Sequence, residues 1–179
     1  MTDSGDDDAL AALRETFGDA PVDAETYEVP PMVFERLADR QQRGALGGAR
    51  AVPRRGEAVL LVRTIDDEGE WSVPGGEREP NEPYAKTAAR TVHEESGLTP
   101  TVDSLLALKR FTFVDAADPD ASVVGHWAWF GATDDGGTVD LQHPGVLDAG
   151  WFTDLPGDLD DAVAARIERW IDSSRSASD

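Results

Sequence analysis

Residues 75–98 decide the fold of this chain, and they read GGEREPNEPYAKTAARTVHEESGL. The pattern predicts a loop, a helix and a turn. The double glycine at its start permits a tight turn with a bare backbone. Asn81 is a suitable N-cap and Pro83 fits a first helical turn. We therefore expect a helix that runs to about Ser96, with Gly97 as its left-handed C-cap.

Two neighbouring carboxylates, Glu94 and Glu95, lie at the end of this predicted helix. At about 100° per residue they fall on one side with Thr87 and Thr91, away from a side of small residues suited to packing. The helix dipole is negative at this end, so the pair is unfavourable unless a cation is present. The helix alone leaves two interpretations open, a hard divalent cation held by oxygen ligands or a solvated acidic face.

The spacing of further residues resembles the Nudix box, the signature of the Nudix hydrolases. That pattern is glycine, five residues, glutamate, seven residues, Arg-Glu, an aliphatic residue, one residue, Glu-Glu, one residue, glycine and an aliphatic residue. Eight of its nine positions are met, namely Gly76, Glu82, Arg90, Val92, Glu94, Glu95, Gly97 and Leu98. Thr91 is the departure, because the family has glutamate there. A match of this length is far more specific than a lone glycine motif.

The resemblance implies an α/β/α sandwich with a mixed sheet and a metal-dependent hydrolase of the diphosphate in a nucleoside diphosphate derivative. By position, Glu94, Glu95 and the Gly75 carbonyl are the expected ligands of Mg²⁺ or Mn²⁺. Glu82 matches a glutamate with a supporting role, and Arg90 matches an arginine that orients carboxylates. An ordinary surface pair with the glutamate four residues on is the alternative for this arginine.

Thr91 puts turnover in question, since a hydroxyl cannot serve as a base and at most holds a water. A second acid that the family places before a late tryptophan is also weak here, with Asp148 the nearest acid to Trp151. Another acid takes over the role, or the chain is a catalytically impaired module that binds or senses a nucleotide. The acids considered for that role are Glu77, Glu79, Glu82 and Asp148.

Composition narrows the class of protein. The chain has 36 acidic and 16 basic residues and a formal charge of −20, with only two lysines. This balance resembles proteins of a high-salt cytoplasm, and it argues against nucleic acid as a partner, which needs a basic footprint. There is no cysteine, no signal peptide and no membrane-spanning run, so we expect a cytoplasmic protein with a small-molecule nucleotide as partner. A homodimer is left open.

The remaining chain predicts three parts. Residues 1–44 are expected to form an acidic tail, through residue 8, and a helical extension. Residues 45–172 form the Nudix domain, and residues 173–179 a frayed tail. Residues 115–122 are predicted to be an acidic loop, in which calcium binding is a remote alternative because the EF-hand spacing is absent. Asp158 is the expected cap of the last helix.

Several aromatic residues could stack on a base, although aromatic residues in strands are more often core. These are Phe111, Phe113, Trp127, Trp129 and Trp151. A lone histidine beside aromatic residues is usually structural, and His126 and His143 are interpreted in that way. His93 is expected to face solvent.

Overall fold

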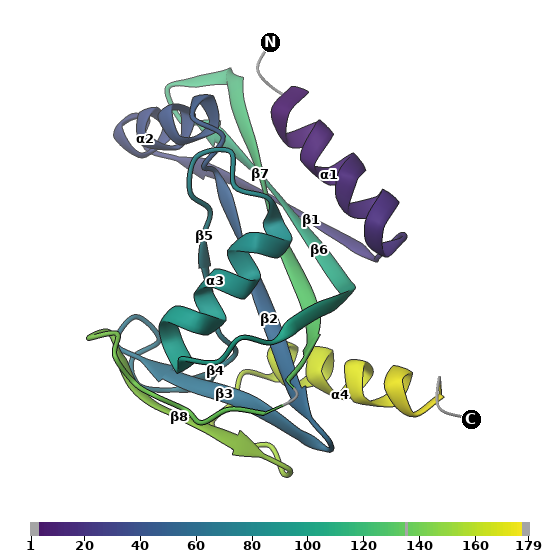
Figure 1. Ribbon diagram of the computed structural model, residues 1–179. Coiled ribbons are helices and arrows are strands. Elements are labelled where there is room, and N and C mark those ends of the chain that lie inside the picture. Colours follow the sequence, from purple (N-terminus) through teal and green to yellow (C-terminus); the bar gives the residue numbers. More distant parts are fainter. Residues whose placement is uncertain (1–3, 135, 177–179) are drawn as a thin grey trace.

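The computed structural model describes residues 4–134 and 136–176, and it shows an eight-stranded mixed sheet flanked by helices (Figure 1). In chain order the elements are α1 (Ser4–Phe17), β1 (Val22–Val29), α2 (Pro31–Gln42), β2 (Gly47–Arg55), β3 (Ala58–Thr64), β4 (Trp71–Ser72), β5 (Gly75–Glu77), α3 (Tyr84–Ser96), β6 (Thr101–Asp115), β7 (Asp118–Thr133), β8 (Val146–Phe152) and α4 (Asp161–Ser176).

The sheet has the strand order β1-β6-β7-β2-β3-β4, with β5 paired to β2 and β8 paired to β3. The β1–β6 and β7–β2 pairs are parallel, and the other pairs are antiparallel. Strand β2 therefore carries β7 along one side, while β5 and the start of β3 share its other side. This arrangement sets the short β5 directly beside the middle of the sheet.

Each face of the sheet has its own core because successive strand residues point to opposite faces. One cluster joins α1 and α3 to the sheet and includes Leu13, Val92 and Phe130. The other joins α4 to the opposite face through Ile167, which packs with Trp129 and neighbouring apolar residues. The predicted α/β/α sandwich with a mixed sheet is confirmed.

The ends of the box helix agree with the sequence at one terminus and differ at the other. Gly97 is the C-cap, with a φ of 77° in the left-handed region, as predicted. The N-cap is Pro83 and not Asn81. Asn81 itself has a φ of 58°, and its backbone N–H donates to the Gly44 carbonyl at 3.0 Å. The chain thus uses Asn81 to turn the loop against the end of α2.

Three other local predictions were wrong. Residues 4–8 are helical in α1 and not a tail, and residues 1–3 lie outside the described residues. The expected acidic loop at 115–122 is mostly strand, because β7 begins at Asp118 and pairs with β6 as a long hairpin. The cap of α4 is Asp160, whose Oδ1 accepts from the Ala162 N–H at 2.9 Å.

Helix α4 also continues through Ser176, past the predicted start of the tail at residue 173. Residues 177–179 of that predicted tail lie outside the described residues. Among the helices that the structure describes, none is long and apolar enough to cross a membrane.

Candidate functional site

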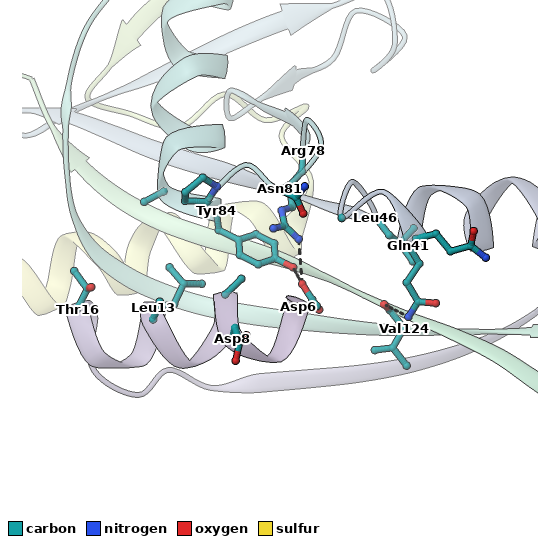
Figure 2. A pocket seen from close by; sticks show the side chains of 16 residues that line it. Asp6, Asp8, Leu13, Thr16, Gln41, Leu46, Arg78, Asn81, Tyr84 and Val124 are labelled. Carbon is teal, nitrogen blue, oxygen red and sulfur yellow. Dashed lines mark hydrogen bonds and ion pairs between the residues drawn. The ribbon is translucent and has the colours of Figure 1, made fainter. Parts of the chain in front are cut away.

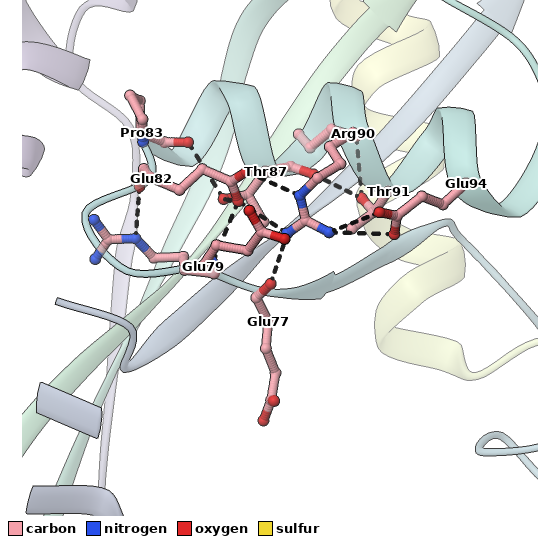
Figure 3. A network of polar contacts seen from close by, with 10 residues as sticks. Glu77, Glu79, Glu82, Pro83, Thr87, Arg90, Thr91 and Glu94 are labelled. Carbon is pink, nitrogen blue, oxygen red and sulfur yellow. Dashed lines mark hydrogen bonds and ion pairs between the residues drawn. The ribbon is translucent and has the colours of Figure 1, made fainter. Parts of the chain in front are cut away.

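The first half of the box helix is held by a dense polar network around Glu82 (Figure 3). Glu82 is 5% exposed and accepts from Arg90 at 2.8 Å and 2.9 Å and from the Thr87 hydroxyl at 2.6 Å. Arg90 also donates to the Glu77 carbonyl at 3.0 Å and to both carboxylate oxygens of Glu94 at 3.2 Å. This arginine therefore ties the glycine loop, the helix start and one of the two terminal glutamates together.

These contacts shift the pKa values of both Glu82 and Arg90. Hydrogen bonds from Arg90 lower the pKa of Glu82 to about 2, although burial acts in the other direction. The same pair raises the pKa of Arg90 above its usual range. A carboxylate with such a low pKa is a poor proton acceptor near neutral pH, so Glu82 supports the loop and is unsuited to act as the missing base.

The two terminal glutamates lie in different surroundings. Glu94 is exposed and forms an ion pair with Arg90. Glu95 is half-buried, and its Oε2 is buried with no hydrogen-bond partner among the described residues. An unpaired buried carboxylate oxygen is costly in free energy. Of the two terminal glutamates, Glu95 is therefore the one whose carboxylate still needs a binding partner.

The surroundings of Glu95 come from three other parts of the chain. Burial raises the pKa of the Glu95 carboxyl to about 7, and the charges of Asp67 and Glu94 add to the rise. Arg50 and a hydrogen bond from the Gly75 backbone N–H oppose it. The sequence had given no sign of Asp67 or Arg50, because both reach Glu95 through the pairing of distant strands.

Thr91 is buried and faces the glycine loop. Its hydroxyl donates to the Thr87 carbonyl at 2.9 Å and lies 3.1 Å from the Ala88 carbonyl. A Cβ added at Gly76 would lie 3.1 Å from the Thr91 methyl carbon. The hydroxyl therefore bonds carbonyls of its own helix.

The donor set fits a divalent cation in part. Glu95 supplies a carboxylate oxygen that lacks a partner, and the Gly75 backbone lies beside it. Hard cations such as Mg²⁺ and Mn²⁺ prefer oxygen ligands of this kind. Glu94 would add a second carboxylate only by leaving Arg90. Within residues 4–134 and 136–176, no group of three or more acidic or histidine side chains is placed to hold a metal ion.

The other predicted acids are exposed and have partners other than Glu95 or Glu94. Glu77 forms an ion pair with Arg40 at 2.6 Å, and Glu79 is exposed. Asp148 is exposed on β8, in register with Arg63 of β3. Among the predicted acids, Glu82 and Glu94 are the two whose carboxylates form ion pairs with Arg90. Asp67, which was not predicted, is a further acid whose charge raises the pKa of Glu95.

The opposite end of α3 is joined to α1 by Asp6, a contact that the sequence did not indicate (Figure 2). Asp6 accepts from Arg78 at 3.1 Å, from the Tyr84 hydroxyl at 2.5 Å, and lies 2.6 Å from Nδ1 of His126. Asp6, Arg78 and Tyr84 border a cavity of about 600 Å³ between α1, α2 and the box loop. The contact gives His126 a structural role, in line with its interpretation from sequence.

Solved structures share this fold at low sequence identity. An ADP-ribose pyrophosphatase from Streptococcus suis 89-1591 superposes with a TM-score of 0.53 at 19% identity, covering 73% of this chain and 92% of that one. The NUDIX domain of Shewanella oneidensis NrtR, complexed with ADP ribose, gives 0.54 at 20% identity, covering 72% and 87%. A UDP-X diphosphatase gives 0.53 at 21% identity, covering 73% and 64%.

No curated protein matches the chain. The model of the NUDIX domain matches residues 45–170, which span the whole of the box and most of the sheet. A match over this share of the chain, together with the fold and the position of the box helix, shows that the chain belongs to the NUDIX family.

Proposed function

We propose that the protein is a metal-dependent hydrolase that cleaves the diphosphate linkage of a nucleoside diphosphate derivative. The observation that carries the proposal is the buried Oε2 of Glu95 beside Gly75, which has no hydrogen-bond partner within residues 4–134 and 136–176. A buried polar atom without a partner lowers the stability of the folded protein, and a bound ligand that pairs with the atom removes this cost. Family membership and the resemblance to an ADP-ribose pyrophosphatase and a UDP-X diphosphatase support the class of substrate.

Glu95, the Gly75 carbonyl and Glu94 would hold Mg²⁺ or Mn²⁺. When bound, such an ion neutralises diphosphate charge and lowers the pKa of water. The remaining residues position this end of the helix. Arg90 orients Glu94 and fixes the loop through the Glu77 carbonyl, and Glu82 holds Arg90 in place.

The test is a substrate panel in Mg²⁺ or Mn²⁺ and high salt, comprising ADP-ribose, sugar nucleotides, dinucleoside polyphosphates and nucleoside triphosphates. Release of a nucleoside monophosphate, lost in E95Q, would support the proposal. Folded protein that cleaves none of these compounds would overturn it.

A second candidate is a module that binds a nucleotide without cleaving it, and Thr91 favours it. This residue has no charge, and its hydroxyl is engaged within the helix. Calorimetry separates the two candidates. Nucleotide binding with no product after several hours would favour the binding module, whereas product formation at any rate above the metal-only control would exclude it.

A further inference from the structure

Four aromatic residues gather on one face of the sheet, and we call them the aromatic shelf: Tyr27, Phe111, Phe113 and Trp127. Tyr27 of β1 is in register with Phe113 of β6, and Lys109 of β6 with Trp127 of β7. Residues in register point to the same face, as do alternate residues along a strand. The rings of Tyr27, Phe111 and Phe113 are stacked, with 6.1 Å between the centroids of each pair.

The shelf is open where the rest of this face is covered. Helix α4 covers the other half of the face, where Trp129 is 5% exposed, whereas Tyr27 is 44% exposed. A shallow, open depression of about 470 Å³ lies over all four rings of the shelf. An exposed group of aromatic rings of this kind can take a flat ring that stacks on it. The structure thus divides the aromatic residues that sequence grouped together, with Trp129 in the core and three others on the shelf.

Trp127 connects the shelf to the glycine loop of the box. A Cβ added at Gly48 would lie 2.8 Å from the Trp127 ring and 2.3 Å from the Gly76 carbonyl oxygen, so the ring and the loop meet across this glycine. The guanidinium of Arg50 lies 5.7 Å from the centre of the Trp127 ring. Arg50 also donates to the Val73 carbonyl at 3.2 Å, just before the loop. Arg50 therefore lies between the two regions, because it contacts Trp127 of the shelf and its charge also acts on Glu95.

A second cavity beside Trp127 is bordered by charges of both signs. This cavity of about 130 Å³ is lined by Trp127, Arg40 and Glu77, and Arg40 forms an ion pair with the Glu77 carboxylate at 2.6 Å. Arg40 is therefore already paired. Arg50, whose guanidinium lies beside the Trp127 ring, is the cation suited to an anionic group here.

We infer that the aromatic shelf binds the base of the substrate nucleotide, while Arg50 faces its phosphates. This inference rests on the proposed function and names the part of the substrate that the site recognises. A purine or pyrimidine base presents a flat π-face, which stacks favourably on aromatic side chains. The contact of Trp127 with Arg50, which also bonds the Val73 carbonyl before the box loop, places the phosphates on the side of that loop.

Binding without turnover tests the inference. ADP, ribose 5-phosphate and inorganic pyrophosphate are titrated by calorimetry in the presence of EDTA. The variants are Y27A and F113A, with Y27F as the conservative change and L147A, an exposed apolar residue on β8, as the matched control. Thermal unfolding of each variant checks that it folds.

We expect Y27A and F113A each to raise the Kd for ADP about tenfold and to leave the Kd for pyrophosphate unchanged. Y27F and L147A should bind ADP as the natural chain does, and ribose 5-phosphate should bind more weakly than ADP. Unchanged ADP affinity in the folded Y27A and F113A variants would overturn the inference. So would a dimer of the natural chain that Y27A converts to a monomer in sedimentation with no change in ADP affinity.

The outcomes separate this inference from the proposed function. Tight ADP binding that depends on the shelf, with no hydrolysis in metal, would keep the shelf and reject the hydrolase. Hydrolysis of a nucleotide with the same KM in Y27A, F113A and the natural chain would keep the hydrolase and reject the shelf.

Discussion

The two ends of the box helix differ in how fully their charges are paired. At the start, Glu82 accepts four hydrogen bonds, including two from Arg90 and one from the Glu79 N–H. At the end, Glu95 retains a buried oxygen with no partner among the described residues. A network in which every polar group is hydrogen-bonded stabilises the loop. A buried polar group without a partner lowers stability until a ligand binds to it. The motif thus has one half whose charges are paired and one half that keeps an unpaired carboxylate oxygen, which we propose as the metal-binding half. The predictions below test that division.

The largest effect is expected for E95Q. Loss of the charge should lower kcat/KM in Mg²⁺ on the order of a thousandfold, because the main ligand of the ion is lost. The metal-free protein should become more stable, since the cost of a buried charge disappears. Steady-state kinetics and thermal unfolding with and without Mg²⁺ measure both. E94Q is the control and should lose less activity, because Glu94 is exposed. Equal losses in the two variants would contradict the division.

Next in size is R90A, which leaves Glu82 buried and unpaired. We expect the free energy of unfolding to fall by about 3–4 kcal/mol. Urea denaturation measures the change. Arg43, which pairs with Asp39 on the surface of α2, provides the control, and R43A should cost under about 1 kcal/mol. The double variant R90A/E82L should recover part of the loss. A loss in R90A no greater than in R43A would show that the network adds nothing.

The low pKa of Glu82 predicts a specific dependence of stability on pH. Its pKa in the folded chain is about 2, against an ordinary 4.5, and this difference corresponds to about 3 kcal/mol. That stability is fully present above about pH 5 and is lost as pH falls toward 2, with more than half lost near pH 3. Urea denaturation from pH 6 to pH 3 should therefore show a shallower decline in E82Q than in the natural chain. Parallel declines would refute the assignment.

The smallest effect is expected for T91E, which restores the glutamate of the family pattern. The new carboxylate would lie in a buried position that faces Gly76, so the metal-free protein should lose stability. Mn²⁺ should bind about tenfold more tightly, because a second buried carboxylate is added near Glu95. Isothermal titration with Mn²⁺ measures the affinity, and T91S is the control for the change in packing. Unchanged or weaker affinity in T91E would contradict the prediction.

The sequence predicted the parts of the fold that depend on local chemistry. Helical spacing and a glycine suited to the left-handed region predicted the end of α3. It failed where pairing between strands decides the structure. The segment at 115–122 is rich in acids and was predicted to be a loop, yet β6 continues to Asp115 and holds the start of β7 in register.

The candidate site shows the same limit. The motif placed Glu94 and Glu95 together, but the burial that distinguishes them depends on segments far away in the chain. Arg50 and Asp67 affect Glu95 through β2 and the loop before β4, and neither has a local signal. Tyr27 joins Phe111 and Phe113 because β1 pairs with β6 in parallel, a register that no short pattern encodes.

That parallel pairing has a consequence for how the protein is made. Strand β1 leaves a ribosome before β6, yet every residue that β1 pairs with lies between positions 108 and 115. The amino-terminal segment must therefore wait, with α1, until more than half of the chain has been synthesised. The contact of Asp6 with Arg78 can form earlier, but its contact with His126 can form only after residue 126 has been added, so the full docking of α1 comes late in synthesis.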